Sequence, residues 1–466
     1  MKWWLMLVLM LSAGVLGGAV DGTASPLRVT STDEFVVLDL DSLGDKGVRV
    51  WHTPNPMRVI VDIEGYVSNL PYVVRVSDVA LNLVRVAANP VAETTRIVME
   101  FDYRLPPPEW EYRDGTLQIV VSKLFSDRSV QSIGMGVRYG HERRGAAAGP
   151  LVINFLEVDF THPLVELKAV LAQDTIVGRE TVSSMASRRQ ALAAANSVYF
   201  AGDGRPLGIL AVDGQLVSEP FAARTALGIG PNHMEISAVR LESEILRLDG
   251  QRAAVSGINR PRGVDELIVY TPVFGESTNT NVYGLDVAVE DGLVTAVRAG
   301  PLPIPADGFV VSGHGSARQF LEPISVGQAL HWDIQMDPPW FEQGISHIIG
   351  GGPRLVRDGE VYITGEAERF QRDILLGRAP RTALGITDEQ KLLIVTVNGR
   401  NPGISVGMTL EELAAFMLEL GAVDAMNLDG GSSTTMVIRD RVLNIPSDGV
   451  ERPVSSSLII TRPDSR

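Results

Sequence analysis

The hexapeptide RTALGI at residues 381–386 occurs a second time, unchanged, at residues 224–229. Each copy follows an Asp-Gly pair set between apolar residues, Asp213-Gly214 in the first case and Asp358-Gly359 in the second. Asp-Gly between short apolar runs is typical of a two-residue β-hairpin turn. The sequence therefore predicts a duplicated unit of hairpin plus strand, with equivalent arginines at equivalent strand ends that face a common cleft.

The surrounding sequence adds more strands than helices. Residues 268–272 and 391–397 are apolar runs typical of buried strands, and residues 183–195 have the pattern of a helix. No sustained alternation of strand and helix is visible, which argues against a parallel α/β sheet. We expect an α+β protein with a small N-terminal β-sandwich and a large, β-rich catalytic domain that contains the repeat.

Length and composition bound the class of protein. The 466 residues are enough for two or three domains, and 45% hydrophobic with 21% charged residues indicates a globular chain. The 41 Lys and Arg are outnumbered by 56 Asp and Glu, for a net charge of −15. Nucleic acid is therefore not an expected partner, and an anionic substrate would need locally placed arginines.

The N-terminus reads as an export signal. Lys2 precedes an apolar run over residues 3–16 and then small residues, which is the pattern of a secretory signal peptide over residues 1–24. The apolar run is short for a membrane span. The chain has no cysteine, which excludes disulfides, a thiolate nucleophile and a lipidated cysteine. We expect a secreted protein associated with the cell envelope or wall, without a stable transmembrane span once the signal is cleaved; the sequence leaves cleavage itself open.

Residues 27–122 form a separate module of short, alternating strand-like runs. The motifs VRVW at 48–51 and PMRVIVDIEG at 56–65 resemble an AMIN domain. The resemblance implies a β-sandwich that holds secreted enzymes at peptidoglycan or another wall polymer; a β-sandwich without a ligand is the alternative. Periodicity is lost over residues 123–149, which we interpret as a linker to a second domain over residues 150–466.

Residues 427–436, NLDGGSSTTM, have the composition of a site. A capping box begins a helix near Thr409, Gly421 ends it, and residues 423–428 form a short strand that delivers Asp429. Gly430 and Gly431 can adopt positive φ and turn backbone N–H groups toward an anion. The alternative is an ordinary Asp-Gly turn between two strands.

Several motifs in a fixed order resemble the phosphodiester glycosidase family, of the N-acetylglucosamine-1-phosphodiester α-N-acetylglucosaminidase or uncovering-enzyme type. They are ANSVYF at 195–200, GGGPRLVRDG at 350–359, RTALG at 381–385, VNGR at 397–400, NLDGGSS at 427–433 and PSDGVERPV at 446–454. The resemblance spans about residues 150–463 and implies hydrolysis of a sugar-1-phosphodiester at the anomeric carbon.

That reaction can be matched to particular residues. A glycosidic bond that breaks through an oxocarbenium-like transition state needs a carboxylate, and Asp429 is the candidate nucleophile or general base. A phosphate leaving group needs a cation more than an acid, and the candidates are Arg381 and then Arg452. Structural ion pairs are the alternative for both arginines. Glu451 and Asp448 are the nearest candidates for a second carboxylate.

Further residues are expected to contact the substrate through amides, hydroxyls or charge; the alternatives are buried amides that satisfy the backbone, hydroxyls on a strand edge and a surface-turn histidine. The expected substrate-binding residues are Asn196, Asn427, Gly430, Gly431, Ser432, Ser433, Thr434, Arg400 and His314. No cofactor is expected, and a divalent cation such as Ca²⁺ is left open because no calcium loop is present. Asn398 departs from the aspartate usual at that position in the family.

The leading hypothesis is a secreted hydrolase that cleaves sugar-1-phosphodiester linkages in cell-envelope or extracellular glycans. One alternative is a non-catalytic wall-glycan-binding or scaffold protein that retains the fold, and another is a phosphodiesterase that cleaves the phosphorus–oxygen bond. The sequence does not give the sugar, the aglycone, the stereochemical outcome or the oligomeric state.

Overall fold

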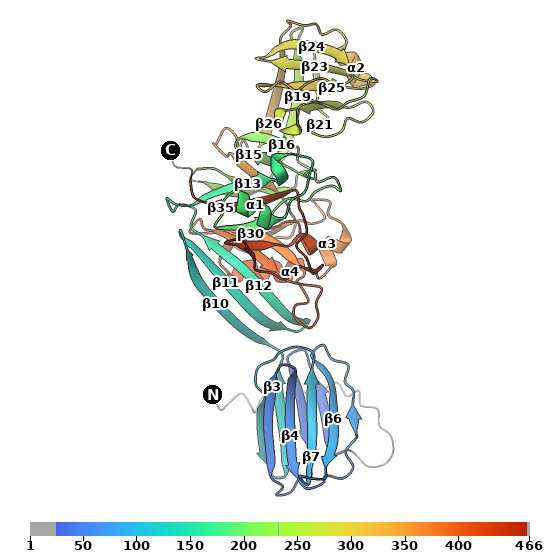
Figure 1. The fold of residues 1–466 in the computed structure, drawn as a ribbon, viewed down its shortest axis with the longest axis vertical. Coiled ribbons are helices and arrows are strands. Elements are labelled where there is room, and N and C mark those ends of the chain that lie inside the picture. Colours follow the sequence, from blue (N-terminus) through green and yellow to red (C-terminus); the bar gives the residue numbers. More distant parts are fainter. Residues whose placement is uncertain (1–24, 232, 464–466) are drawn as a thin grey trace. The chain divides into compact units, whose positions relative to one another are not determined.

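The computed structural model describes residues 25–231 and 233–463 (Figure 1). The predicted signal peptide, residues 1–24, lies outside these ranges. In the described ranges no helix is both long enough and apolar enough to span a bilayer. The chain forms two compact units: unit 1 is Met1–Asp127 with Arg143–Pro150 and Pro402–Ile404, and unit 2 holds the rest.

Unit 1 is a β-sandwich of two sheets, as its alternating sequence predicts. One sheet has the order β1 (Leu27–Ser31), β2 (Phe35–Leu40), β9 (Thr116–Ser122), β8 (Glu109–Arg113), and the other β3 (Val48–Pro54), β4 (Met57–Glu64), β7 (Thr94–Phe101), β6 (Leu81–Asn89), β5 (Val73–Val74). Alternate residues of β2, β4 and β7 are buried, and both sheets contribute to one apolar core. The other face of each strand is left to solvent.

Unit 2 contains five sheets. The first has the order β10 (Phe125–Gly134), β11 (Val137–Ala146), β12 (Gly149–Val158), β31 (Leu392–Val397), β30 (Arg381–Thr387), β32 (Ala422–Asn427), β28 (Arg354–Arg357), β29 (Glu360–Val361). The second is β13 (Glu166–Leu171), β35 (Ser456–Thr461), β14 (Ala193–Asn196), β33 (Met436–Ile438), β34 (Arg441–Val442), and the third is β16 (Gln215–Ser218), β15 (Leu210–Val212), β27 (His347–Gly350), β17 (Thr225–Ile229), β18 (Met234–Ala238). These three sheets supply the main apolar core.

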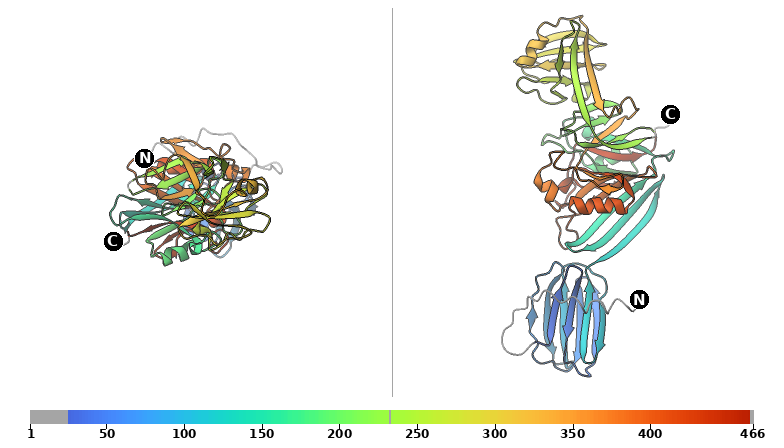
Figure 2. Two further views of the ribbon diagram at one scale, coloured as in Figure 1. Left: turned by 90° about the horizontal axis from the view of Figure 1, so that it is seen from above. Right: turned by 180° about the vertical axis from the view of Figure 1, so that it is seen from behind.

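The remaining two sheets are inserted between β18 and β27. They are β20 (Arg252–Ala254), β19 (Arg240–Arg247), β26 (Leu330–Asp337), and β21 (Gly257–Ile258), β22 (Leu267–Tyr270), β25 (Gly308–Gly313), β23 (Leu285–Glu290), β24 (Leu293–Ala299). The long pair β19 and β26 leads out to the five-stranded sheet, which has its own apolar core (Figures 1 and 2). The insertion is thus a β subdomain within unit 2.

The expectation of an α+β class is wrong, because 48% of the structure is strand and 8% is helix. The described helices are short: α1 (Val182–Arg188), α2 (Ser316–Leu321), α3 (Arg372–Leu376), α4 (Leu410–Glu419), and the 3₁₀ turns η2 (Ala172–Asp174), η3 (Pro272–Phe274), η4 (Gly431–Ser433). The predicted helix over 183–195 ends at Arg188, and its alanines enter the buried strand β14. Burial between strands overrides the helix propensity of alanine there.

The stretch predicted as a linker, residues 123–149, is mostly regular. It forms β10 and β11, which extend the eight-stranded sheet. Strand β10 is exposed along most of its length, so its sequence lacks the apolar alternation that identifies a half-buried strand.

The duplicated unit predicted from RTALGI is present. Hairpin β15–β16 turns at Asp213-Gly214 and hairpin β28–β29 at Asp358-Gly359, with positive φ at all four residues. In each copy of the unit, a strand from later in the chain lies between the hairpin and the strand that carries RTALGI. This strand is β27 in the first copy and β32 in the second, and the two copies are called halves below. The resulting orders, β16-β15-β27-β17-β18 and β29-β28-β32-β30-β31, are the same.

The strand registers of the two halves also agree. Ala226 pairs with Gly350 in the first half, and its equivalent Ala383 pairs with Asn427 in the second. The next backbone bonds match as well: Gly351 N–H donates to Thr225 at 2.9 Å, and Leu428 N–H donates to Thr382 at 2.8 Å. The chain that follows β27 is therefore equivalent to the chain that follows β32, which carries Asp429.

Candidate active site around Asp429

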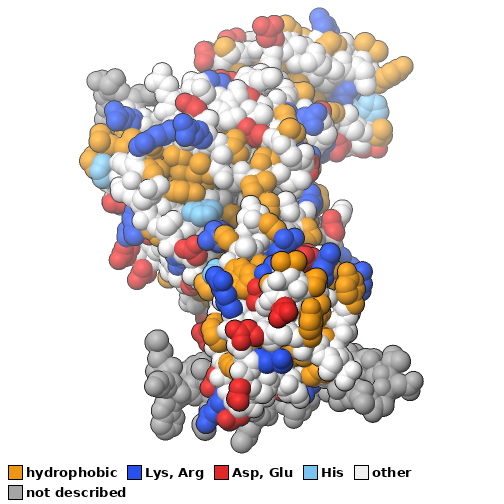
Figure 3. All heavy atoms as spheres, turned by 60° about the horizontal axis from the view of Figure 1, so that its bottom comes forward, with side chains coloured by type: hydrophobic (Ala, Val, Ile, Leu, Met, Phe, Trp, Pro, Cys, Tyr) orange, Lys and Arg blue, Asp and Glu red, His pale blue; other side chains and the backbone are white. Residues whose placement is uncertain are grey.

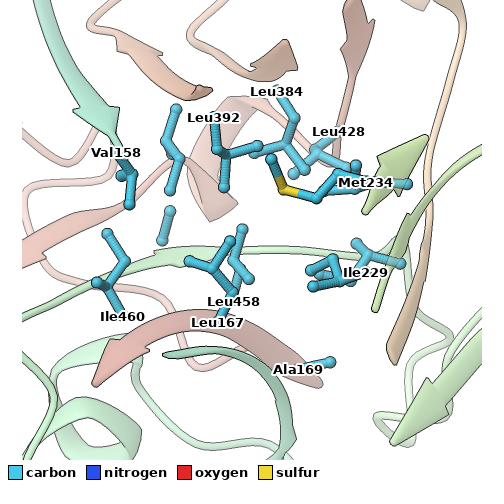
Figure 4. Packing of buried hydrophobic residues seen from close by; sticks show 14 of the residues in the cluster. Val158, Leu167, Ala169, Ile229, Met234, Leu384, Leu392, Leu428, Leu458 and Ile460 are labelled. Atoms are coloured by element: carbon cyan, nitrogen blue, oxygen red, sulfur yellow. The ribbon is translucent and has the colours of Figure 1, made fainter. Parts of the chain in front are cut away.

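Local structure delivers Asp429 as the sequence predicts. Helix α4 begins with a complete capping box between Thr409 and Glu412, and Gly421 follows it at φ 90°. Strand β32 then runs through the eight-stranded sheet, and Leu428 packs beside Leu384 and Met234 in the core (Figure 4). Because side chains alternate in extended chain, Asp429 is turned away from that core.

The environment of Asp429 shifts its acidity. Desolvation by burial raises the pKa of the carboxyl from 3.8 to about 6. Hydrogen bonding from the Ser433 hydroxyl and the Gly430 N–H, and the positive charge of Arg452, oppose that rise in pKa. A carboxyl that titrates near pH 6 can exchange a proton close to neutral pH, which general acid–base catalysis requires.

Two buried amides hold the backbone on both sides of Asp429. Asn196, at the end of β14, donates to the Asp429 carbonyl at 2.7 Å and accepts from Thr382 Oγ1 at 2.8 Å. Asn427 donates to the Leu428 carbonyl at 2.7 Å and to the Tyr199 hydroxyl at 2.9 Å. Both amides therefore position the Asp429 loop. The predicted contact of Asn196 and Asn427 with a sugar stays a prediction.

Arg381 begins β30 and is only 3% exposed. Its Nε donates to the Met408 carbonyl at 3.0 Å, and its Nη2 donates to the carbonyls of Ile374 and Gly377. Within the described ranges no carboxylate pairs with it, and Nη1 has no hydrogen-bond partner. Burial lowers the pKa of this guanidinium below its usual value, and the charges of Tyr199, Glu411 and Asp373 offset that effect only in part.

Arg452 and Arg400 lie at the open side of Asp429. Arg452 is exposed and donates to Ser433 Oγ at 3.0 Å. Its guanidinium carbon lies 5.0 Å from the centre of the Phe200 ring. Arg400 donates to Ser432 Oγ at 3.3 Å, and that hydroxyl donates to Asp448 at 2.9 Å. The structure thus brings Arg452, Ser433 and the Arg400–Ser432–Asp448 chain into contact with the Asp429 turn.

The two glycines do not form the expected anion-binding concavity. Gly431 has φ 60°, but Gly430 is extended at φ −118°. The Gly431 N–H donates to the Pro380 carbonyl at 2.9 Å, and the Gly430 N–H interacts with Asp429 itself. A Cβ at Gly430 would lie 2.8 Å from that same carbonyl oxygen. The glycines allow the Asp429 turn to pack closely on the start of β30.

Other predicted residues are placed less favourably for a substrate contact. Glu451 accepts from the Ser183 N–H at 2.9 Å and so binds the N-terminus of α1. Thr434 is buried, and its hydroxyl has no partner within the described chain. His314 follows β25 in the inserted subdomain, where its N–H donates to Glu266 at 3.2 Å. Within residues 25–231 and 233–463, no hydrogen bond or ion pair joins His314 to Asp429 or to the residues that contact the Asp429 turn.

Asn398 occupies the position where the family resemblance leads us to expect aspartate. Its Oδ1 accepts from the Ile445 N–H at 3.1 Å, and its backbone carbonyl accepts from Ser405 Oγ at 2.7 Å. An aspartate could make the same acceptor bond to Ile445. The asparagine is thus compatible with the loop that precedes Asp448.

Metal binding at Asp429 is untested. In the part of the chain that the structure describes, no three His, Asp or Glu side chains are grouped as metal ligands would be. Two surface hollows of about 240 Å³ each lie elsewhere, one lined by Arg247 and Leu330 and the other by Trp110. Charges and hydrogen bonds, and not a large cavity, therefore define the candidate site at Asp429.

Tyr199 is the member of this group that the sequence did not single out. Its buried hydroxyl donates to the carbonyls of Gly352 and Leu428 at 3.0 and 3.1 Å. Burial and the Asp429 charge raise the pKa of this phenol, whereas Arg381 and Arg224 act in the opposite direction. Tyr199 lies in the ANSVYF motif of the family resemblance, but an aromatic residue beside valine usually indicates core, so nothing in the motif marks this side chain as functional.

Part of the chain is similar to known proteins. Residues 283–461, which include Arg381, Asp429 and Arg452, match the family model for phosphodiester glycosidases. Mouse N-acetylglucosamine-1-phosphodiester α-N-acetylglucosaminidase is 28% identical over 174 residues, which cover 34% of this chain and 30% of the mouse enzyme. An uncharacterized SPβ prophage-derived protein of Bacillus subtilis is 38% identical over 85 residues, or 18% of this chain and 13% of that protein.

The fold extends over more of the chain than the sequence similarity does. A crystal structure of a hypothetical protein from Synechocystis matches with a TM-score of 0.66 and 20% identity, covering 94% of this chain and 80% of that one. The chain spans less than a third of the two curated relatives above. Homology to phosphodiester glycosidases is therefore established at low identity for the C-terminal part.

Proposed function

We propose that this protein is a secreted phosphodiester glycosidase that releases a sugar from a sugar-1-phosphodiester, of the N-acetylglucosamine-1-phosphodiester type, in envelope or extracellular glycans. The observation that carries the proposal is a carboxyl with a pKa of about 6 beside an exposed arginine, Arg452. The Asp429 turn also packs on the start of β30, which carries the buried Arg381, and within the described chain no carboxylate pairs with that arginine. This combination fits an anomeric carbon attached to a phosphate.

The ionised Asp429 acts at the anomeric carbon. As a general base it takes a proton from water while the water oxygen bonds to that carbon. As a nucleophile it forms a glycosyl ester that water then hydrolyses. In both cases the bond between the anomeric carbon and the phosphate oxygen breaks with its electron pair on the phosphate. The leaving group is a phosphomonoester anion, and Arg381 and Arg452 stabilise its charge.

The N-terminal sandwich would hold the enzyme at a wall polymer such as peptidoglycan. Trp51 on β3 is partly exposed, and the guanidinium carbons of Arg49 and Arg96 lie 5.2 and 5.4 Å from its ring centre. Arg96 also forms a bidentate pair with Asp62 on the next strand. A partly exposed tryptophan with hydrogen-bonding groups next to it can contact a sugar ring.

The test is sugar release by the purified full chain. Wild-type protein should release free N-acetylglucosamine from an α-N-acetylglucosamine-1-phosphodiester with a methyl aglycone, and Asp429→Asn should reduce the rate at least about a thousandfold, as loss of a central catalytic carboxylate does. Asp440→Asn makes the same chemical change in an exposed turn and should retain wild-type rates. Full activity of Asp429→Asn would remove Asp429 from the mechanism.

Two further results would replace the proposal. Polymer binding without turnover on a panel of sugar phosphodiesters would indicate the binding protein considered above. Hydrolysis in ¹⁸O-labelled water that places the label in the phosphate would indicate cleavage of the phosphorus–oxygen bond, whereas label in the sugar supports a glycosidase.

A further inference from the structure

Arg224 is the structural equivalent of Arg381. It directly precedes β17 as the first residue of the other RTALGI copy, and the strands that follow the two arginines have the same register against β27 and β32. Arg224 lies outside the residues that match the phosphodiester glycosidase model. Sequence similarity to that family therefore assigns it no role.

The side chain of Arg224, like that of Arg381, donates to backbone carbonyls, but it is partly exposed and also stacks on two aromatic rings. Its Nε donates to the Glu368 carbonyl at 3.0 Å, and its guanidinium stacks 3.8 Å from the Phe370 ring centre and 4.6 Å from that of Phe221. Among the described residues no carboxylate forms an ion pair with Arg224, and Nη1 has no hydrogen-bond partner. The charge of Glu368 acts on the pKa of Arg224 without forming an ion pair with it. An oriented guanidinium with an Nη1 that is not yet bonded is suited to bind an anion.

Contacts lead from Arg224 to the Asp429 group. Phe370 packs against Tyr199 with ring centres 5.6 Å apart, and the Tyr199 hydroxyl bonds to Asn427 and to the Leu428 carbonyl next to Asp429. The charges of Asp429, Arg381 and Arg224 all act on the pKa of this one hydroxyl. The two equivalent arginines thus approach the same group from the two halves of the duplication.

The number of cations exceeds what one phosphodiester needs. A phosphodiester carries a single negative charge, whereas Arg381, Arg452 and Arg224 all lack an ion-pair partner within the described chain. Of the two equivalent arginines, Arg381 is the one whose strand packs against the Asp429 turn, because Gly430 lies on the Pro380 carbonyl and on the backbone of Arg381. Arg224 is therefore available to bind a second negative charge, farther along the substrate.

We infer that Arg224 binds a second anionic group on the leaving side of the substrate, so that the preferred substrate is a sugar-1-phosphodiester whose aglycone carries another phosphate. Sugar-phosphate polymers and sugar diphosphates share this chemistry. The inference rests on the proposed function. It makes Arg224 a specificity-determining residue, with Asp429 as the catalytic residue.

The test compares two substrates of the same sugar on the full chain. One is the methyl phosphodiester, and the other is a phosphodiester whose aglycone ends in a phosphomonoester. Wild-type protein should have the lower KM for the second substrate. Arg224→Gln should reduce the ratio of kcat/KM for the second substrate to that for the first about tenfold, as loss of a charge-assisted hydrogen bond does. Arg224→Lys should restore part of the ratio.

A merely structural role for Arg224 gives a different result. If the side chain only braces Phe370, Arg224→Gln lowers the melting temperature and affects both substrates equally, which overturns the inference. Arg357→Gln removes an exposed arginine that stacks on Tyr362, and it controls for net charge with an unchanged ratio.

A binding measurement separates this inference from the proposed function. Titration calorimetry with inorganic pyrophosphate should give weaker binding to Arg224→Gln than to wild type, whether or not either sugar substrate is turned over. If neither substrate is hydrolysed but pyrophosphate binding depends on Arg224, the proposed function fails and the anion site stands. If pyrophosphate binding is the same in both proteins, the anion site is rejected.

Discussion

At the scale of the residue, Asp429 combines partial burial with a raised pKa. The mechanism needs its ionised form, so activity should rise as the carboxyl loses its proton. We expect kcat/KM to fall about tenfold per pH unit below pH 6 and to level off above pH 7, because the Asp429 pKa is about 6. The measurement is a pH–rate profile of the methyl phosphodiester. An inflection near pH 4 would show that Asp429 titrates as an ordinary surface carboxyl.

Because its pKa is raised, the ionised form of Asp429 destabilises the folded protein. Because the folded pKa is above the unfolded value, the folded state retains the proton between pH 3.8 and 6, and the free energy of unfolding decreases as pH rises through that window. Asp429→Asn should therefore be more stable than wild type above pH 7 by about 3 kcal/mol, with little difference below pH 4. Thermal unfolding at both pH values checks this. Equal stability at pH 7.5 would contradict it.

At the scale of the element, the segment after β27 is equivalent to the segment that carries Asp429, and it places Gly352 where the other half has the aspartate. Gly352 has φ 99°, and a Cβ there would collide with Glu368 Oε2 and Phe370. Gly352→Ala should destabilise the protein by roughly 2 kcal/mol or more. Gly359→Ala, at φ 74° with open space around it, should cost only about 1 kcal/mol. Similar losses in denaturant unfolding would show that the collision is relieved.

The elements that could be predicted are those with a local signal. The Asp-Gly hairpins, the capping box of α4 and strand β32 each depend on neighbouring residues, and all are present. The sequence of β14 predicts helix instead, because Ala193, Ala194 and Ala195 favour helix in isolation. The sequence of β10 predicts a linker, because the strand has no buried face and so no apolar alternation.

The candidate site divides in the same way. Asp429, Arg381 and Arg452 stand in polar or repeated motifs that mark them, whereas Tyr199 belongs to the group only through bonds to residues more than a hundred positions away. The repeat marks Arg224 as the equivalent of Arg381. The sequence predicts that the two arginines face a common cleft, and in the structure the charges of both act on the pKa of Tyr199. Long-range contacts of this kind leave no pattern in a single sequence.

At the scale of the whole molecule, the proposed catalysis and the proposed retention belong to different parts of the chain. Acidic and basic side chains are interspersed over the face seen in Figure 3, so this face presents no single field of charge. In unit 1 the stacked Trp51 is the candidate contact for a wall polymer.

Trp51→Ala in the full chain should reduce co-sedimentation with insoluble peptidoglycan severalfold, because aromatic stacking on a sugar ring is lost. Hydrolysis of the soluble methyl phosphodiester should not change. Trp110→Ala, which removes a tryptophan that is 48% exposed on the other sheet, is the matched control. Equal loss of binding in both variants would mean that the polymer contacts the sandwich elsewhere, and no co-sedimentation of wild type would reject this partner.

The insertion between β18 and β27 bears on the order of folding. Strand β17 lies beside β27, which the chain reaches only after the whole inserted subdomain, whereas β28 to β32 of the other half follow one another without such an interruption. Because closing a long loop costs entropy before its contacts form, the half with Asp429 should become protected from hydrogen exchange before the half with Arg224. Asp429 would thus take its place on a sheet that has already formed. Arg224 would take its place later, when β27 pairs with β17 and completes the other sheet.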